Sequence, residues 1–435
     1  MGHFCAVYCL VFDKTGRLFV TGSDDKLIKV WNSRTCCLVR TMRGHVSDIV
    51  DLSVSCDNRF LASAGNDLDV RIWWLHNGVP AFVLPGHQQV IANVRFSWAM
   101  HADLSQSLYS WGHDGALREW KISSDGSSFS SRVFLTSEAQ VPPGPHPPRK
   151  APEILCATIH RWGSWVAVGC SDRMIRIYLL NSKISRPIRW NGHMDRVEYI
   201  TSNASGNLIV SGSLDGTVRI WRTDKFLTLV DQRILNLRQG EEQQTGRSVE
   251  RVKVNMVSLS SDGSKVISSQ SLEKKRKDNK WLCRIKIWAV DTGELIHNLR
   301  DAHEQPVFVV EAHPSDPRVM ATAGYDARVV LWDIVGGKAI KEFHIRFPLD
   351  DRLSPIDFDA RTSDILEGKW HPDGTSLVLT HKNGHFSILT CGNYSENLAR
   401  TAREQFFQTD FGELSMDVQH NVIDLQAQVP PHLLP

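Results

Sequence analysis

The sequence predicts an all-β fold, a single eight-bladed β-propeller, on three observations. An Asp followed six residues later by an aromatic residue, with alternating apolar residues between them, occurs six times. Two weaker copies bring the number to eight, and successive copies end 42 to 67 residues apart. A Gly-His or Ala-His pair lies 22 to 27 residues before the Asp of five copies. Units of this length are typical of propeller blades, which bury both faces only against their neighbours.

Each copy of the pattern predicts two strands joined by a tight turn at the Asp. The sixth and eighth copies lack the Asp: they end at Trp288 and Leu389, with Leu282 and Asn383 in the Asp place. The eight blades together account for residues 1–390. The six complete copies are Asp25 to Trp31, Asp67 to Trp73, Asp114 to Trp120, Asp172 to Tyr178, Asp215 to Trp221 and Asp326 to Trp332.

The upstream histidines predict a polar network inside each blade. In a four-stranded antiparallel blade, the loop before the first strand and the turn after the second strand lie at the same end, so each His is expected to bond the Asp of its blade. The other ring nitrogen then reaches a Ser or Thr that also meets the Trp indole. A buried network of this kind stabilises only when every member is satisfied. The histidines are His3, His45, His87, His193 and His303, and the expected hydroxyls are Ser23, Ser63, Ser110, Ser213 and Thr322.

This repetition favours a structural role for these residues over a catalytic one, because a Ser-His-Asp set that recurs in several blades of a ring is part of the fold. Blades 4, 6 and 8 lack the Gly-His pair and are expected to be held by apolar packing alone. The nine cysteines are never spaced C-x-x-C, and no H-E-x-x-H, G-x-S-x-G, Walker or G-x-G-x-x-G motif is present. We therefore expect no enzyme activity, no metal and no cofactor.

Composition narrows the classes of partner. The chain has 42% hydrophobic and 23% charged residues, which is typical of a globular protein. Its formal net charge of +2 is too small for the surface as a whole to attract nucleic acid or an anionic membrane. No apolar run approaches the roughly 18 residues that a membrane span needs. Other proteins or peptide tails are the expected partners, with no membrane and no direct nucleic-acid binding.

Three insertions and a tail depart from the repeat. The insertions are expected near 123–152, 272–280 and 347–363. The second contains Lys274-Lys275-Arg276-Lys277, which suits a nuclear-import patch and suits an ordinary solvated loop equally well. The tail, residues 391–435, is expected to complete the last blade in part, with an outer strand between Thr390 and Phe411, because Met1 lies too close to His3 to donate one.

Several stretches resemble a known family. The Asp-to-Trp repeat with its Gly-His is the WD40 signature, and the stretch from Gly2 to Arg17 resembles the first repeat of the bromodomain and WD-repeat proteins. Val307 to Pro314 in the seventh blade resembles the same family, and the tail segments Gln405 to Phe411 and Pro430 to Pro435 resemble the segment that follows the propeller in that family. The resemblance implies a nuclear, chromatin-associated regulator of transcription, with roles in cell shape and cytoskeleton organisation. Bromodomains and acetyl-lysine binding are not expected here, because every residue is already assigned to strands, loops or tail.

The same resemblance implies a docking site for the propeller adaptor of cullin-4 ubiquitin ligases. Several family members look like substrate receptors that dock through a Trp-Asp-x-Arg box, and Trp31, Asn32 and Arg34 form a variant of it here. The spacing places Arg34 just past the third strand, opposite the His and Asp turns, where a guanidinium can fork onto a partner carboxylate. The competing interpretation is a solvated loop residue.

The end of the ring that bears the turns is the predicted surface for peptides or histone tails. There the residue before each Asp is expected to ring the channel mouth. The first function hypothesis is a nuclear interaction scaffold, with a ligase-receptor role; the alternative is a structural assembly platform with cytoplasmic partners. The six mouth residues are Asp24, Asn66, His113, Ser171, Leu214 and Tyr325.

Overall fold

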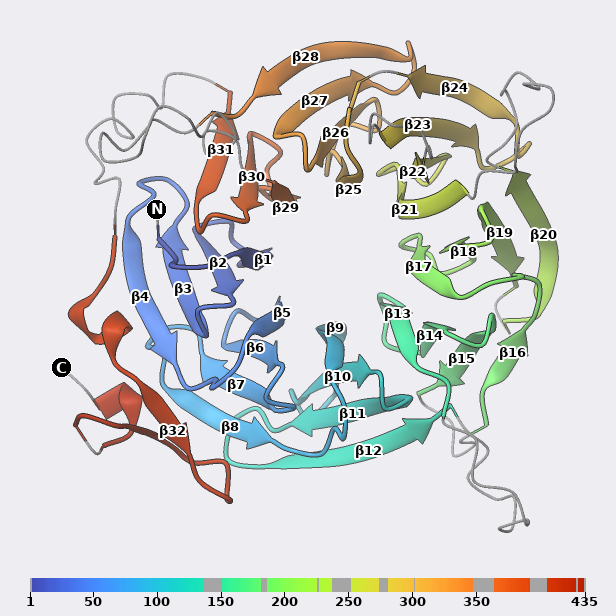
Figure 1. The fold of residues 1–435 in the computed structure, drawn as a ribbon. Helices are drawn as coiled ribbons and strands as arrows, with labels where there is room; N and C mark the ends of the chain where they lie inside the picture. Colours follow the sequence, from blue (N-terminus) through green and yellow to red (C-terminus); the bar gives the residue numbers. More distant parts are fainter. Residues whose placement is uncertain are drawn as a thin grey trace.

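The computed structural model describes residues 2–136, 151–180, 186–224, 227–236, 252–273, 281–300, 302–346, 364–391, 405–427 and 429–433. Eight antiparallel sheets are arranged in a closed ring around a central axis (Figure 1), and a ninth, two-stranded sheet belongs to the tail. The eight-bladed, all-β fold is therefore confirmed. No helix in the described part of the chain has the length and apolarity needed to cross a membrane.

Blades 1 to 4 each contain four strands in sequence order, with the first strand innermost. Their bounds are β1 (Val7–Phe12), β2 (Leu18–Ser23), β3 (Leu27–Asn32) and β4 (Leu38–Arg43); β5 (Ile49–Val54), β6 (Phe60–Gly65), β7 (Val70–Trp74) and β8 (Pro80–Leu84); β9 (Ile91–Met100), β10 (Gln106–Gly112), β11 (Ala116–Ile122) and β12 (Phe129–Leu135); β13 (Ile154–Ile159), β14 (Trp165–Cys170), β15 (Ile175–Leu179) and β16 (Ile188–Trp190).

Blades 5 to 7 repeat this order, and blade 8 has three strands within the described residues. Their bounds are β17 (Val197–Ser202), β18 (Leu208–Ser213), β19 (Thr217–Thr223) and β20 (Leu229–Asn236); β21 (Val252–Leu259), β22 (Lys265–Glu273), β23 (Trp281–Ala289) and β24 (Leu295–Arg300); β25 (Val307–Ala312), β26 (Val319–Gly324), β27 (Arg328–Asp333) and β28 (Lys338–His344); β29 (Ile365–Trp370), β30 (Ser376–His381) and β31 (Phe386–Thr390).

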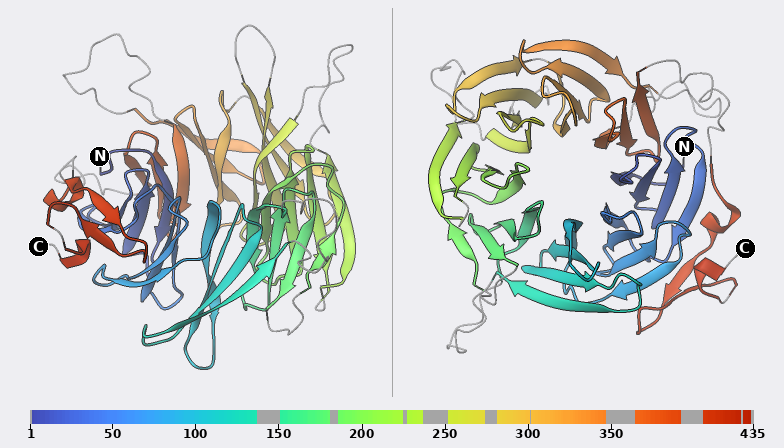
Figure 2. Two further views of the ribbon diagram at one scale, coloured as in Figure 1. Left: turned by 60° about the horizontal axis from the view of Figure 1, so that its bottom comes forward. Right: turned by 180° about the vertical axis from the view of Figure 1, so that it is seen from behind.

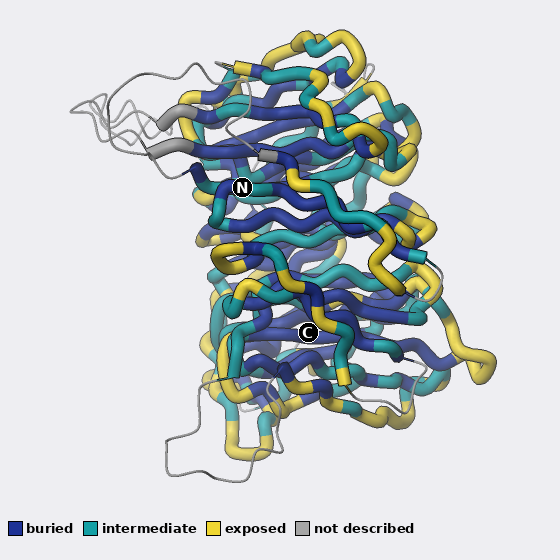
Figure 3. The backbone as a smooth tube through the Cα atoms, turned by 90° about the vertical axis from the view of Figure 1, so that its right-hand side faces the viewer, coloured by how far each residue is buried: buried dark blue, intermediate teal, exposed yellow. Residues whose placement is uncertain are grey.

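The second strands of the blades are among the most buried elements of the fold. β6, β14 and β18 are buried at every position, whereas the outer strand β28 is exposed at nearly every position. Second strands consist of small and β-branched residues, such as Phe-Leu-Ala-Ser-Ala-Gly in β6, because both of their faces meet neighbouring blades. Figure 3 shows the exposed positions gathered in the loops and along the outer edges.

The ring closes where blade 8 packs against blade 1. The Leu10 amide of β1 donates to Glu367 Oε2 of β29 at 2.6 Å, and the His3 amide donates to the Gly384 carbonyl at 3.2 Å. At the other end of these two blades, where the β1–β2 turn lies, His371 Nε2 donates to the Gly16 carbonyl at 2.7 Å. Blade 8 therefore meets blade 1 side by side, through hydrogen bonds and packed side chains.

The described residues test only part of the expectation that the outer strand of blade 8 lies between Thr390 and Phe411. Residues 392–404 lie outside the described residues, and there the expectation stays a prediction. For residues 405–411 it is wrong, because Gln405 Oε1 accepts the Leu38 amide of β4 at 2.6 Å, so this stretch lies on blade 1. The tail then follows the outer edges of blades 1 and 2 (Figure 2). It contains η2 (Gln408–Phe411), β32 (Leu414–Met416), β33 (Val422–Asp424) and η3 (Pro431–Leu433).

The first two insertions are shorter than expected. Phe129–Leu135, inside the expected 123–152, forms the outer strand β12 and pairs with β11. Its serines are compatible with a strand because that strand is mostly exposed. Likewise β22 extends through Leu272 and Glu273, so the second insertion begins later. The rest of it, 274–280, and the whole of 347–363 lie outside the described residues.

Candidate functional site

Five blades contain the expected four-residue network. In blade 1, His3 Nδ1 lies 2.8 Å from Asp25 Oδ2, His3 Nε2 lies 2.8 Å from Thr21 Oγ1, and the Trp31 indole donates to the same hydroxyl at 2.9 Å. The other four networks, with every corresponding distance between 2.7 and 3.1 Å, are His45–Asp67–Ser63–Trp73, His87–Asp114–Ser110–Trp120, His193–Asp215–Ser211–Trp221 and His303–Asp326–Thr322–Trp332.

Two of the five expected hydroxyls are wrong. The hydroxyl always belongs to the residue four positions before the Asp, which is Thr21 in blade 1 and Ser211 in blade 5. Ser23 and Ser213 lie two residues closer to the turn. There each accepts the amide of the repeat Asp and donates to a carbonyl of the loop before the first strand, Cys5 and Asp195 respectively. They shape the turn instead of joining the network.

The repeat Asp also builds the turn that holds it. Asp25 Oδ1 accepts the Leu27 amide at 3.0 Å, and Lys26 between them has a φ of 70°, in the left-handed region. Burial alone would raise the pKa of Asp25, but the bond and charge of His3 and the Phe4 and Leu27 amides hold that pKa below its ordinary value. The carboxylate is thus fully used by its own blade, which supports a structural role.

The blades without Gly-His are not held by apolar packing alone. In blade 6 the Trp288 indole donates to Ser268 Oγ at 3.1 Å, so a Trp–Ser bond like that of the network forms without the His or the Asp. In blade 4, Asp172 Oδ1 accepts Arg176 Nη1 at 2.8 Å. In blade 8, His381 Nε2 lies 2.9 Å from Ser387 Oγ. These bonds use part of the polar capacity of the three blades, because leaving a buried polar group unpaired is costly.

The six mouth residues occupy equivalent places at the end of the ring that bears the His–Asp pairs. The amide of each donates to a carbonyl in the loop before the first strand of its own blade, at 2.8 to 3.2 Å. All six are half-buried. The accepting carbonyls belong, in blade order, to Ala6, Asp48, Val90, Glu153, Arg196 and Pro306.

Charge at this end is uneven. Burial, with the charges of Asp48 and Asp25 adding to it, raises the pKa of Asp24 to about 6. Asn66 Nδ2 donates to Asp48 Oδ2 at 3.2 Å, so Asp48 ties the mouth residue of blade 2 to this acidic group. The mouth is therefore acidic on blades 1 and 2, where a cationic group is favoured over an anionic one.

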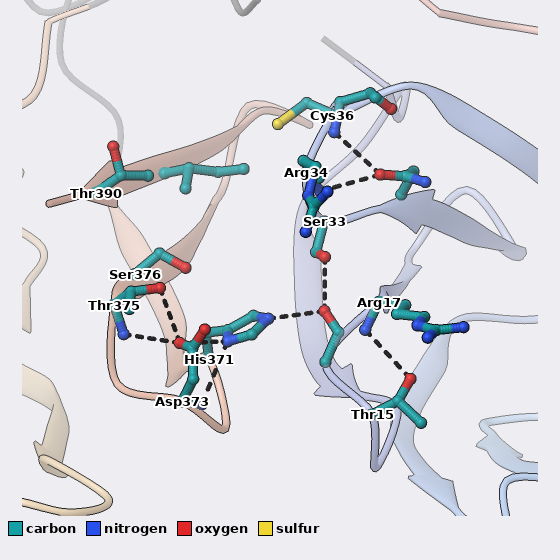
Figure 4. A pocket seen from close by; sticks show the side chains of 14 residues that line it. Thr15, Arg17, Ser33, Arg34, Cys36, His371, Asp373, Thr375, Ser376 and Thr390 are labelled. Carbon is teal, nitrogen blue, oxygen red and sulfur yellow. Dashed lines mark hydrogen bonds and ion pairs between the residues drawn. The ribbon is translucent and has the colours of Figure 1, made fainter. Parts of the chain in front are cut away.

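A pocket of about 550 Å³ lies at the other end of the ring, between blades 1 and 8 (Figure 4). The β1–β2 turn contributes Arg17, the β3–β4 turn contributes Asn32 and Arg34, and blade 8 contributes His371 and Asp373. His371 Nδ1 lies 2.5 Å from Asp373 Oδ1. The expected docking box therefore forms one wall of a polar pocket.

The three residues of that box have different roles. Arg34 is exposed, and within the described residues its guanidinium has no hydrogen bond or ion pair. Asn32 Oδ1 accepts the Arg34 and Thr35 amides, both at 3.0 Å, so it fixes the turn just as Asp333 does where it accepts the Val335 amide. Trp31 is 0% exposed, so its expected direct contact with a partner is wrong.

Sequence reasoning missed the blade 8 wall of this pocket. The available signal was a repeated His-Pro at the end of two successive first strands, at His313 and His371. His313 Nε2 donates to the Gly374 carbonyl of the next blade at 2.9 Å, as His371 does to Gly16. The repetition shows that both residues join neighbouring blades. Within the described residues, no group of three or more His, Cys, Asp or Glu side chains is arranged to hold a metal ion.

Comparison with known sequences matches five segments to the WD40 family (WD domain, G-beta repeat): residues 1–32, 36–73, 145–178, 185–222 and 293–333. A bromodomain and WD repeat-containing protein of Dictyostelium discoideum is 29% identical over all of this chain, which spans 21% of that relative. Periodic tryptophan protein 2 of Saccharomyces cerevisiae is 21% identical over 87% of this chain and 48% of its own length. A ribosome biogenesis protein WDR12 homolog of Chlamydomonas reinhardtii is 25% identical over 50% of this chain and 54% of its own length.

Two solved structures share the fold. The β-propeller domain of Cps50 (Swd1) from Myceliophteria thermophila has a TM-score of 0.54 at 17% identity and covers 77% of this chain and 97% of its own. The computationally designed Ika8 protein has a TM-score of 0.59 at 19% identity and covers 90% of this chain and 98% of its own. At these identities the likeness concerns the propeller alone.

Proposed function

We propose that this chain, which matches WD40 repeats in five segments and is similar over its whole length to a bromodomain and WD repeat-containing protein, is a nuclear, non-enzymatic interaction scaffold in chromatin-linked regulation of transcription. Its specific role in this proposal is that of a substrate receptor of a cullin-4 ubiquitin ligase. Roles in cell shape and cytoskeleton organisation follow from the same family resemblance. The chain spans only about a fifth of the Dictyostelium relative, so partners of the rest of that protein are not assigned here.

The main support for the receptor role is the exposed side chain of Arg34. Its backbone is fixed by the Asn32 cap, while its guanidinium stands exposed at the rim of a polar pocket without a partner in the described residues. A guanidinium presented in this way can make a forked contact with a carboxylate of the ligase adaptor. The opposite, acidic end of the ring then remains free for a basic peptide, such as a histone tail, near Asp24 and Asp48.

Co-precipitation of the adaptor with wild-type and Arg34→Ala protein tests this proposal. Truncating one partner of a desolvated charge pair costs about 2 to 5 kcal/mol of binding, so the variant is expected to lose the adaptor. Its melting temperature should stay unchanged, because exposed substitutions usually alter stability by less than about 0.5 kcal/mol. Val335→Ala, at the equivalent turn of blade 7, is the matched control and should retain the adaptor.

The competing function is that of a structural assembly platform with cytoplasmic partners. One relative, the WDR12 homolog, is named for ribosome biogenesis and suggests a second platform, a pre-ribosomal particle, although its match covers only half of this chain. Imaging the protein in cells and sedimenting it with ribosomal precursors separates these functions. If wild-type protein never recovers the adaptor, or if Arg34→Ala recovers it equally well, the receptor role should be abandoned.

A further inference from the structure

The outer rim of blade 1 shows how this propeller binds an acidic segment. We define the rim corner of a blade as the residue after the repeat His together with the residue four positions after the repeat Asp. In blade 1 these are Phe4 and Lys29. Lys29 Nζ lies 2.5 Å from Asp410 Oδ2 of the tail, and both side chains are 0% exposed. The Phe4 ring stacks on Phe406 of the tail at 4.4 Å. The tail therefore satisfies this corner with one carboxylate and one aromatic ring, four residues apart.

The rim corner of blade 2 is covered by the same tail. Its members are Val46 and Arg71. Arg71 Nη2 donates to the His420 carbonyl at 3.4 Å, and Val46 lines a small pocket together with Leu425. In both tail-covered corners, an apolar residue follows the His and a cationic residue occupies the third strand. The tail meets each corner with apolar side chains and oxygen acceptors.

The corners of other blades are satisfied within their own blade. In blade 3, Gln88 follows the His, and Arg118 Nη2 donates to the Gly86 carbonyl. In blade 7 the corner residues are Glu304 and the buried Val330, and Glu304 accepts the nearby Arg328 Nη2 at 2.8 Å. These corners carry a polar residue where blades 1 and 2 carry Phe4 and Val46. They offer neither an uncovered apolar side chain nor an unpaired cation.

Blade 5 is different, because its rim corner combines an apolar residue with a cation, as blade 1 does, and its apolar residue stays exposed in the described structure. Met194 follows the His and is 72% exposed. Arg219, in the third strand, is only 8% exposed, yet within the described residues it has no hydrogen bond or ion pair. Burial lowers the pKa of Arg219, and Asp215, the acid that opposes this shift, is already bonded to His193. Arg219 is thus a buried cation that lacks an acceptor, a costly arrangement.

A second donor points to the same place. Gln232, on the outer strand of blade 5, has a buried Nε2 without a partner among the described residues. A Cβ placed on Gly192 would lie 2.5 Å from Arg219 Nη1 and 2.8 Å from Gln232 Nε2, so both donors converge beside this glycine. Two unpaired donors next to an exposed thioether match a ligand that presents a carboxylate and an apolar side chain together.

We propose that the rim corner of blade 5 binds an acidic segment of a partner protein, with a carboxylate on Arg219 and Gln232 and an aromatic or apolar side chain on Met194. The spacing follows that of Phe406 and Asp410, so the ligand carries its aromatic residue four positions before its acid. In Figure 1 blade 5, which contains β17 to β20, lies across the ring from the tail. The site is also separate from Arg34, and its test does not depend on the ligase-receptor proposal.

Fluorescence polarisation with a labelled peptide tests the site on the full chain. The probe has the sequence of residues 405–411, Gln-Phe-Phe-Gln-Thr-Asp-Phe, and the comparison peptide carries Asn in place of its Asp. We expect the Asn peptide to bind at least about tenfold more weakly, because charge-assisted hydrogen bonds are roughly twice as strong as neutral ones. Binding should also weaken as salt is raised.

Variants of the protein locate the bound peptide. Met194→Ser, an exposed substitution that leaves the fold intact, should weaken binding, and Arg219→Gln should weaken it further if it folds. Arg118→Ala, the matched corner position of blade 3, should leave binding unchanged. No binding of the Asp peptide, or equal binding of both peptides, would overturn the proposal. So would binding that is lost with Phe4→Ser but kept with Met194→Ser, since the peptide would then be displacing the tail from blade 1.

Discussion

Replacing Asp410 with Asn should destabilise the whole propeller through its first blade. Lys29 Nζ has two acceptors, Asp410 Oδ2 at 2.5 Å and the Gln405 carbonyl at 3.3 Å, and both come from the tail. The Asn side chain keeps the volume of Asp but removes the charge that compensates a fully buried ammonium. Asp410 also accepts the Phe407 amide at 3.0 Å, a contact that the Asn oxygen can keep. The perturbation is therefore close to a pure charge deletion.

Breaking a buried ion pair by removing one partner costs about 3 to 5 kcal/mol. Unfolding entropy is about 2.1 cal/mol/K per residue near 60 °C, or about 0.9 kcal/mol/K for a chain of 435 residues that unfolds as one unit. The melting temperature should then fall by about 3 to 6 °C. The free energy of tail docking sets an upper limit, because a tail that detaches lets Lys29 reach water.

Scanning calorimetry on three proteins measures the effect: wild type, Asp410→Asn, and the double variant Lys29→Met/Asp410→Leu. Replacing both partners with apolar residues of similar size is often neutral, so the double variant should melt near the wild type. Limited trypsin digestion reports separately whether the tail has detached. Equal losses for Asp410→Asn and the double variant would refute the reasoning, because the deficit would then come from packing and not from an uncompensated charge.

Three further outcomes follow from the burial and bonding of single residues. Trp221→Ala, which removes a fully buried indole, should cost about 3 to 5 kcal/mol in urea unfolding, whereas Trp162→Ala, at 71% exposure, should change little. Ser211→Ala removes the hydroxyl that bonds both His193 Nε2 and the Trp221 indole, and it should lower stability by about 1 to 3 kcal/mol, more than Ser213→Ala does. A larger loss for Ser213→Ala would contradict the network assignment. Burial, with the charge of Asp51 adding to it, raises the pKa of Glu367 to about 7 from an ordinary 4.5. The folded state therefore holds the proton more tightly than the unfolded state, and the contribution of this residue to stability falls as pH rises from about 4.5 to 7. Glu367→Gln should flatten that part of a plot of melting temperature against pH.

The fold was predictable because its determinants are local and repeated. The Asp, the Trp and the upstream His recur at fixed spacing, and the spacing alone places them in one blade. The choice between Ser23 and Thr21 was not predictable from one blade, because both side chains lie on the second strand and both bond. Only comparison across the five blades that carry the His shows that the network hydroxyl lies ten residues before the Trp.

The candidate sites were harder to predict because they join residues that are distant in sequence. Arg34 was found through a local motif, but the pocket around it needs His371 and Asp373 from the last blade. The Lys29–Asp410 pair spans 381 residues: Lys29 lies in the first repeat and Asp410 in the tail, and neither pattern indicates that the two residues pair. Strand alternation indicates that Lys29 shares a face with Trp31 and is therefore buried, yet no local signal identifies the carboxylate that accompanies it.

The distance in sequence between Lys29 and Asp410 also has a consequence for how the protein is made. Synthesis proceeds from the amino terminus at about 5 to 20 residues per second, so the 381 residues between them take roughly 20 to 80 seconds to appear. During that interval the first blade carries an uncompensated cation and an uncovered Phe4. Blade 1 therefore leaves the ribosome first but reaches its final form among the last, and a chaperone that shields exposed aromatic surface on a nascent chain has its natural target there.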